Sequence, residues 1–315
     1  MESFLVSRRW QTGKATHKGT RKNKNEDSYL HRHAIDSEGN EIAMFAVADG
    51  MGGYEVGDTA SKLAISFFQR WWDKRIIKLL KKRDIMERIA REGASTMKQI
   101  NTSIKATSLH TGKKMGTTLS LLIMFKGQYV VLHVGDSRIY QMRGWNYGLQ
   151  QYFHHANQED LTSLLQEQST EILESNPELV KLTEDHSWVE RQVKDGILTD
   201  EDARNHPKRN VLTQCLGIED EINPQIKMGQ YQSSDMFLVC SDGFHSLYSN
   251  EEILTMLINL EKEYTNLQMM CEYLINFCNF SNAEDNITLM LIRNLYVEKT
   301  DTKGKRNLFS ILGMK

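Results

Sequence analysis

Proline is scarce in this chain, with 3 prolines in 315 residues. Element boundaries must therefore be taken from glycine and from changes in hydrophobic period. The four cysteines, Cys215, Cys240, Cys271 and Cys278, form no C-x-x-C pair, and two of them lie inside apolar runs, where reduced thiols usually pack as small hydrophobic groups. A reducing cytosol fits this pattern. No apolar run approaches the roughly 18 residues of a membrane span, and the opening MESFLVSRRW has no apolar stretch long enough for a signal peptide. We expect a cytoplasmic chain without a membrane anchor.

The sequence also lacks an excess of either charge. Its 39 Lys and Arg face 41 Asp and Glu, a net charge of −2, so no overall field exists to collect nucleic acid or an anionic membrane. Apolar residues make up 40% and charged residues 25%, which are ordinary values for a globular protein. The length allows one large domain or two average ones.

The periodicity of apolar residues predicts groups of strands separated by pairs of helices. Short β-rich or apolar runs predict strands, whereas apolar residues at helical spacing predict helices. The expected strands are residues 42–48, 117–125, 129–140, 222–230, 236–240 and 287–292, and the expected helices are 59–80, 83–110, 251–260 and 267–280. Strands and helix pairs follow one another without regular β-α-β alternation, which favours antiparallel sheets covered by helices and an α+β fold.

Two segments differ in composition from the rest. Residues 150–180 are rich in Gln, Glu, Asn and His with few leucines, and we expect a partly helical insertion spanning about 146–180. Residues 297–315 form a polar, basic tail that ends in the apolar run 308–312. Either segment is a candidate docking element for a partner or a substrate.

Aspartates recur where the predicted apolar runs begin or end. Asp49, Asp136, Asp242 and Asp285 occupy such positions. A single Asp-Gly is in most cases only a turn, but four acidic groups at strand ends cost desolvation and repel one another unless cations compensate. Hard oxygen ligands without a His or Cys cluster favour Mg²⁺ or Mn²⁺ over Zn²⁺. The sequence therefore predicts a divalent metal site.

Basic and acidic residues stand side by side near the N-terminus. Arg21 and Lys22 precede Glu26 and Asp27. Such a charge run is most often a solvated loop. If the acids approach the strand-end aspartates, the cations would hold an anionic group such as phosphate beside the metals.

Six short motifs in order resemble those of the metal-dependent type-2C serine/threonine protein phosphatases, the PPM family. They are Asn25-Glu26-Asp27, Ala48-Asp49-Gly50-Met51-Gly52-Gly53, Met115-Gly116-Thr117-Thr118, Gly135-Asp136-Ser137-Arg138, Ser241-Asp242-Gly243 and Asp285-Asn286. The resemblance covers residues 16–293, and residues 181–217 resemble the flap of the bacterial branch. It implies a phosphatase-like domain over residues 1–296 with its flap at about 183–217, followed by the tail.

The resemblance implies a four-layer α-β-β-α sandwich, with two antiparallel sheets between helix pairs, and a two-metal hydrolase. By resemblance, Asp49 bridges two Mn²⁺ or Mg²⁺ ions, with Glu26 and the Gly50 carbonyl on one ion and Asp242 and Asp285 on the other. Asp136 matches a position linked to a third, weaker ion. A metal-bridging hydroxide would attack the phosphorus of phosphoserine or phosphothreonine directly, without a covalent phosphoenzyme.

Three positions depart from patterns found in the family. Where relatives have a phosphate-binding arginine, this chain has Lys22, next to Arg21, and either cation is a candidate for that role. Met51 replaces the histidine of animal members, as in bacterial ones, and Ser246 replaces an often acidic residue. We expect a monomer that acts on a phosphoprotein and opposes a serine/threonine kinase. The alternative is a regulatory or weakly active binding protein on the same fold.

Overall fold

The computed structural model describes residues 10–36, 38–52, 56–144, 177–232 and 235–294. Within them, the chain folds into two five-stranded sheets whose neighbouring strands are all antiparallel. Sheet I has the order β1 (Trp10–His17), β12 (Ile287–Asn294), β11 (Met236–Cys240), β8 (Arg138–Arg143) and β9 (Glu178–Lys181). Sheet II has the order β10 (Gln225–Gln230), β7 (Gln128–Val134), β6 (Leu119–Phe125), β3 (Glu41–Ala48) and β2 (Ser28–Ile35). The short strands β4 (Gly50–Met51) and β5 (Gly116–Thr117) pair separately.

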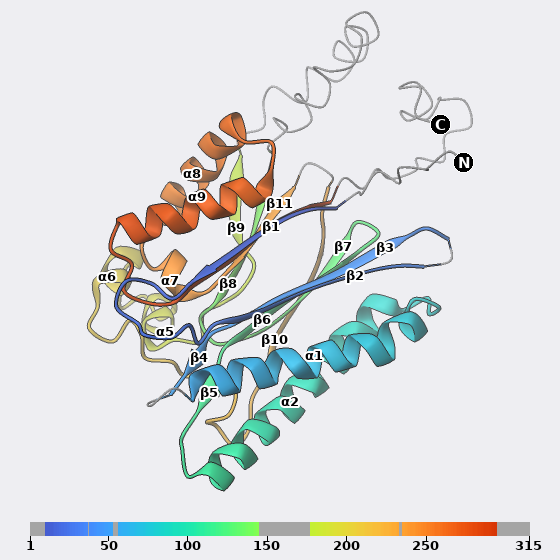
Figure 1. Cartoon of the computed structure of the whole chain (residues 1–315), viewed down its shortest axis with the longest axis horizontal. Helices are drawn as coiled ribbons and strands as arrows, with labels where there is room; N and C mark the ends of the chain where they lie inside the picture. The colour runs from blue at the N-terminus through green and yellow to red at the C-terminus, as the bar shows by residue number, and fades with distance from the viewer. Residues whose placement is uncertain (1–9, 37, 53–55, 145–176, 233–234, 295–315) are drawn as a thin grey trace, which may run out of the picture.

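Helix pairs cover the outer faces of both sheets (Figure 1). The helices α1 (Gly57–Leu79) and α2 (Ile85–Thr111) pack on sheet II. The helices α8 (Asn250–Glu263) and α9 (Leu267–Phe280), drawn in orange, pack on sheet I. The part of the chain that the structure describes also contains the shorter helices α5 (Trp188–Lys194), α6 (Asp200–Asn205) and α7 (Asp242–His245). The four-layer α-β-β-α sandwich implied by the sequence is confirmed.

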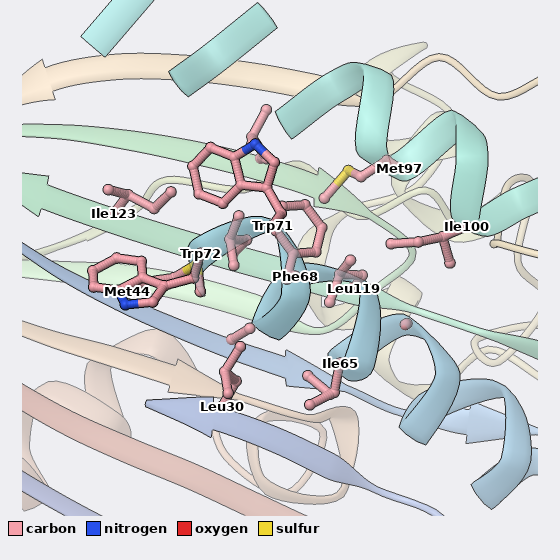
Figure 2. Close-up of a cluster of buried hydrophobic side chains, with 14 of the residues drawn as sticks. Leu30, Met44, Ile65, Phe68, Trp71, Trp72, Met97, Ile100, Leu119 and Ile123 are labelled. Carbon is pink, nitrogen blue, oxygen red and sulfur yellow. The ribbon is translucent and has the colours of Figure 1, made fainter. Parts of the chain in front are cut away.

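Alternation along the central strands explains why they are apolar on both sides. In β3, Met44 belongs to the cluster under the helices, whereas Phe45 belongs to the cluster between the sheets. In β11, Leu238 faces α8 and α9, whereas Val239 faces the other sheet. Strands buried on both faces are read from the sequence as continuous apolar runs. Figure 2 shows the layer between sheet II and its helices, where ten buried side chains are labelled: Leu30, Met44, Ile65, Phe68, Trp71, Trp72, Met97, Ile100, Leu119 and Ile123.

The predicted strand 129–140 is wrong in its extent. The run 129–140 was expected to be continuous, but the chain breaks it into β7 and β8, which belong to different sheets. Gly135 lies at the break with a φ of 112°, a conformation that side-chain-bearing residues avoid. Asp136 therefore lies where the chain crosses from sheet II to sheet I.

Apart from the two-residue strand β4, three of the described strands lie outside the sequence prediction: β1, β2 and β9. Each is at the edge of its sheet, and its residues are largely half-buried or exposed. Edge strands keep one side in contact with solvent and therefore carry polar side chains. Their mixed composition conceals the strand period that the central strands show.

The expected insertion lies mostly outside the described residues, as does the basic tail. The strand β9 begins at Glu178, so the last three residues of the expected range 146–180 are part of sheet I. The segment expected to form the flap carries α5 and α6, whose N-termini are capped by the side chains of Ser187 and Thr199. Among the described residues, no helix has both the length and the apolar character needed to span a bilayer.

Candidate active site

Antiparallel pairing brings the strand-end acids to one end of the sandwich. The end of β3 pairs with the start of β2 at Ala48 and Ser28. The end of β11 at Cys240 pairs both with Arg138, the first residue of β8, and with Leu289 near the start of β12. The residues just beyond these ends therefore share one edge: Asp27, Asp49, Asp136, Asp242 and Asp285.

The carboxyls of Asp49 and Asp242 lie within hydrogen-bonding reach of each other, although they come from different sheets. Desolvation by burial is the largest cause that raises the pKa of both groups. The pKa of Asp49 rises further because Asp27, Asp242 and Asp136 repel its charge, and Asp285 does the same to Asp242. The site therefore concentrates negative charge that the protein itself only partly compensates.

Asp27 is a member of this cluster that the sequence analysis did not assign to the site. Burial raises its pKa to about 7, against the hydrogen bonds of Thr288 and Ser241 and together with the charges of Asp242 and Asp285. The Ser241 hydroxyl donates to Asp27 Oδ2 at 2.8 Å, while Oδ1 is buried without a partner among the described residues. Its position in the motif Asn25-Glu26-Asp27 was the sequence feature that could have assigned Asp27 to the site.

The motif threonines hold the backbone of Asp49. The Asp49 N–H donates to Thr118 Oγ1 at 2.9 Å, and the Thr118 N–H donates to the Asp49 carbonyl at 2.9 Å. Thr117 Oγ1 donates to the same carbonyl at 2.8 Å. Thr118 Oγ1 also lies 2.7 Å from Ser137 Oγ, which connects Asp49 to the crossing segment beside Asp136. These threonines belong to a motif identified in the sequence, but the sequence alone assigned them no role.

The N-terminal loop is held at the site by Asn286. Its side-chain amide donates to the carbonyls of Lys18 and Lys24, both at 2.9 Å, and its Oδ1 accepts from the Glu26 N–H at 2.8 Å. Glu26 Oε1 accepts from the Gly57 N–H at 3.0 Å. A Cβ on Gly57 would lie 2.7 Å from the Gly50 carbonyl oxygen and 2.8 Å from Glu26 Oε1. These two oxygens therefore lie together beside a residue that has to be glycine.

The two candidate phosphate-binding cations point to different partners. Lys22 Nζ lies 2.9 Å from Asp285 Oδ1. Partial burial acts to lower the pKa of Lys22, but Asp285, Asp49 and Glu26 outweigh it and raise the pKa. Arg21 instead pairs with Glu284 at 2.7 Å, with both side chains largely exposed. The structure brings Lys22 to the acids and leaves Arg21 at the surface.

A charged pocket of about 400 Å³ opens beside Asp136 and Asp242, walled by the flap helices and the start of α8. Among its lining residues, Arg138 makes a two-pronged contact with Asp185 at 2.6 to 3.0 Å. Burial acts to raise the pKa of Asp185, but Arg138 and Lys181 hold it well below its usual range. His245 Nε2 lies 2.9 Å from the Asp136 carbonyl, which only accepts, so this nitrogen carries the proton.

The donor set fits hard divalent cations. Asp242 Oδ1 and Asp27 Oδ1 are buried oxygens without a partner among the described residues, and a cation would satisfy both. Carboxylates with a neighbouring backbone carbonyl are typical ligands of Mg²⁺ and Mn²⁺. Within the described ranges, no three His, Cys, Asp or Glu side chains already stand close enough together to hold an ion. Binding would therefore require side-chain movement, including release of Lys22 from Asp285.

Comparison with known proteins decides the family. The family model of protein phosphatase 2C matches residues 16–286. The chain belongs to the protein phosphatase 2C family. The serine/threonine phosphatase stp of Listeria welshimeri is 32% identical over 253 residues, which cover 80% of this chain and 85% of that protein.

Solved structures of serine/threonine phosphatases share the fold. The serine/threonine phosphatase PstP/Ppp of Mycobacterium tuberculosis superposes with a TM-score of 0.68 at 24% identity, covering 91% of this chain and 99% of that one. A second structure, the catalytic domain of PstP with two manganese ions, gives a TM-score of 0.64 at 22% identity over 90% and 97% of the two chains. The predicted family, its bacterial branch and the assignment as a protein phosphatase are confirmed.

Proposed function

We propose that this chain hydrolyses phosphoserine and phosphothreonine in proteins and depends on Mn²⁺ or Mg²⁺. The observation that carries the proposal is that the carboxyls of Asp49 and Asp242, from different sheets, lie within hydrogen-bonding reach of each other. The carboxyls of Asp27, Asp136 and Asp285 are close enough to shift the pKa values of these two groups. The names of the relatives, serine/threonine phosphatases, and the manganese ions in the PstP structure support it.

The proposed ligands follow the geometry of the loops. Glu26, Asp49 and the Gly50 carbonyl would hold one ion, and Asp49, Asp242 and Asp285 a second. Asp136 would contribute to a third, weaker one, and Asp27, through its unpartnered oxygen, would support the cluster. When bound, the ions supply a Lewis acid that offsets the phosphate charge and lowers the pKa of the attacking water.

The protein's own groups position the substrate. Lys22 is the cation that faces the acids, and we assign it the phosphate, with its ammonium exchanging Asp285 for a phosphate oxygen. Lysine offers a point charge rather than the planar fork of arginine, so it attracts the phosphate without fixing its orientation. The threonines at positions 117 and 118 keep the backbone of Asp49 in place while the substrate binds.

The biological setting is part of the proposal. The described cysteines are all unpaired and buried, which supports a reducing cytoplasm. We place the enzyme there as a monomer opposing a serine/threonine kinase.

Hydrolysis of a phosphothreonine peptide tests the proposal. We expect phosphate release with Mn²⁺, loss of release in excess chelator, and recovery when Mn²⁺ is restored. Asp242→Asn should stay inactive under all three conditions. Full turnover in chelator, or full turnover by Asp242→Asn, would refute a metal-dependent reaction.

A second candidate function is a regulatory binding protein with weak or no turnover. The pairing of Lys22 with Asp285 favours it, because the same lysine occupies a proposed metal ligand. Calorimetric titration separates the two candidates. Tight Mn²⁺ binding without turnover on any phosphopeptide supports the regulatory protein, and tight binding with turnover supports the enzyme.

A further inference from the structure

The outer side of α9 exposes a stripe of large apolar side chains. Met269 is 50% exposed, Tyr273 44%, Phe277 38% and Phe280 87%. Positions spaced by three and four residues lie on one side of a helix. The opposite side, which includes Met270, Leu274 and Cys278, is buried against sheet I. Contiguous exposed apolar patches of this kind mark interaction surfaces more often than single exposed residues do.

Aromatic rings extend this stripe toward α8. Tyr248, which precedes α8, stacks with Phe277 at a centroid distance of 6.0 Å. Phe277 stacks with Tyr273 at 6.2 Å, and Tyr273 lies 6.1 Å from Tyr264, the residue that follows α8. The rings therefore form a continuous row along the α8–α9 pair, which lies on the outside of the molecule (Figure 1). We call Tyr248, Tyr264, Met269, Tyr273, Phe277 and Phe280 the aromatic row.

The two helices that carry most of the aromatic row have an excess of negative charge. The helices α8 and α9 together carry five glutamates against one lysine. Of these glutamates, Glu261 is buried in an ion pair with Arg293, whereas Glu251, Glu252, Glu263 and Glu272 are exposed. An apolar strip on helices that also expose acids fits an apolar segment flanked by basic residues.

The chain itself contains a segment of that composition. Residues 295–315 follow β12 directly and hold five Lys or Arg against two Asp or Glu. The apolar run 308–312 is preceded, one residue earlier, by a basic stretch with Lys303, Lys305 and Arg306. Thirteen residues separate Asn294 from Leu308, and thirteen residues of fully extended chain span at most about 45 Å. Since β12 itself packs against α9, the aromatic row is within reach.

We propose that residues 308–314 dock on the aromatic row of their own chain. The apolar side chains Leu308, Phe309, Ile311 and Leu312 would cover the exposed rings, and the preceding basic residues would lie against the glutamates of α8. A second copy of the face is a poorer occupant, because a symmetric dimer places identical acidic borders against each other. Tethering makes the intramolecular contact effective even when the isolated affinity is low.

Photocrosslinking in the full-length chain tests the proposal. With Phe309→p-benzoylphenylalanine, we expect irradiation to link position 309 to peptides within residues 248–280, with a yield independent of protein concentration. Phe280→Ser in the same chain should reduce this yield roughly tenfold, because the docked state loses the free energy of burying about one aromatic side chain. Ile77→Ser, at a 55% exposed site on α1, is the matched control and should leave the yield unchanged.

Charge provides a second variant that leaves the apolar contacts in place. Replacing Lys303→Glu and Lys305→Glu should lower the yield at low salt and make it insensitive to added salt. Links that join two chains, or links that fall outside residues 248–280, would overturn the proposal. Crosslinking does not depend on phosphate release. A negative crosslinking result would therefore leave the proposed phosphatase activity unaffected, and a lack of phosphatase activity would leave the docking proposal unaffected.

Discussion

Asp49, which follows β3 in one sheet, and Asp242, which follows β11 in the other, bring their carboxyls into hydrogen-bonding reach. Two desolvated carboxyls that repel each other are unfavourable for folding. The buried apolar layer between the two sheets stabilises the fold. This stability compensates for the unfavourable free energy of the carboxyl pair.

Removing one of these charges should separate stability from activity. In the absence of metal, we predict that Asp242→Asn raises the free energy of unfolding by about 1 kcal/mol, because repulsion around Asp49 falls. With Mn²⁺, the same variant should lose activity by about 100-fold or more. Thermal melts with and without Mn²⁺, together with phosphopeptide turnover, check both parts. Asp73→Asn, at an exposed position on α1, is the control, and an equal change there would contradict the electrostatic explanation.

Adding Mn²⁺ should stabilise the wild type and leave Asp242→Asn nearly unchanged. Binding to the folded state alone adds about 2.7 kcal/mol at a concentration 100 times the dissociation constant. A wild-type melting temperature that does not move with Mn²⁺ would argue against the oxygen ligands proposed here.

The two adjacent cations should differ in effect. Lys22→Ala removes a charge that faces Asp285, Asp49 and Glu26, and we predict a rise in KM for a phosphopeptide of about tenfold or more, as for loss of a charged hydrogen bond. Arg21→Ala removes an exposed ion pair with Glu284 and should change KM by less than about threefold. Steady-state kinetics at saturating Mn²⁺ give the comparison. A larger effect at Arg21 would reassign the phosphate to that residue.

Thr118→Val tests the support beneath Asp49. Valine keeps the shape of threonine but removes the oxygen that accepts the Asp49 N–H and contacts Ser137. We predict a fall in kcat of about tenfold, equivalent to one net hydrogen bond, with KM for the phosphopeptide little changed. Thr102→Val, on an exposed turn of α2, is the control. A change in KM alone would show that Thr118 acts on substrate binding instead.

His133 should make stability depend on pH. It is fully buried on β7, where Nε2 faces the Glu184 carbonyl at 3.1 Å and Nδ1 lies 2.8 Å from the Ser120 hydroxyl of β6. Burial and then the neighbouring His186 lower its pKa to about 3, against the smaller opposing effect of Asp185. Because the unfolded chain takes up the proton first, stability is complete above the ordinary histidine pKa near 6.5 and is lost as pH falls toward 3.

The loss attributable to His133 between pH 7 and pH 4.5 is about 3 kcal/mol. Denaturant unfolding of the wild type and His133→Gln at both pH values measures it, since glutamine can pair with the same two groups but does not titrate. The free energy of unfolding of the wild type, taken relative to that of His133→Gln, should fall by about this amount between pH 7 and pH 4.5. His110→Gln, at the exposed end of α2, should follow the wild type. Parallel pH curves for wild type and His133→Gln would exclude this role.

The central strands and the strand-end acids were predictable from sequence for the same reason. A strand such as β3, buried on both faces, needs a continuous apolar run, and Asp49 is conspicuous at its end. The edge strands β1 and β2 carry polar residues on their open sides, so their period is hidden. The division of residues 129–140 between two sheets depends on Gly135, whose positive φ no periodicity reveals.

Within the site, the chemistry of the residues was predictable but their pairing was not. Lys22 and Arg21 are adjacent and similar in sequence, and only the fold turns one toward Asp285 and the other toward Glu284. Asp27 adjoins a predicted ligand, yet its burial depends on Ser241, more than 200 residues away. Contacts of this range follow from sheet topology, which local pattern does not specify.

Anomalous scattering from crystals soaked in Mn²⁺ tests the central claim most directly. We predict two strong peaks flanking Asp49, one shared with Glu26 and the Gly50 carbonyl and one with Asp242 and Asp285, with Lys22 displaced from Asp285. An absence of peaks among these carboxylates in soaked crystals, with Lys22 still paired to Asp285, would contradict it.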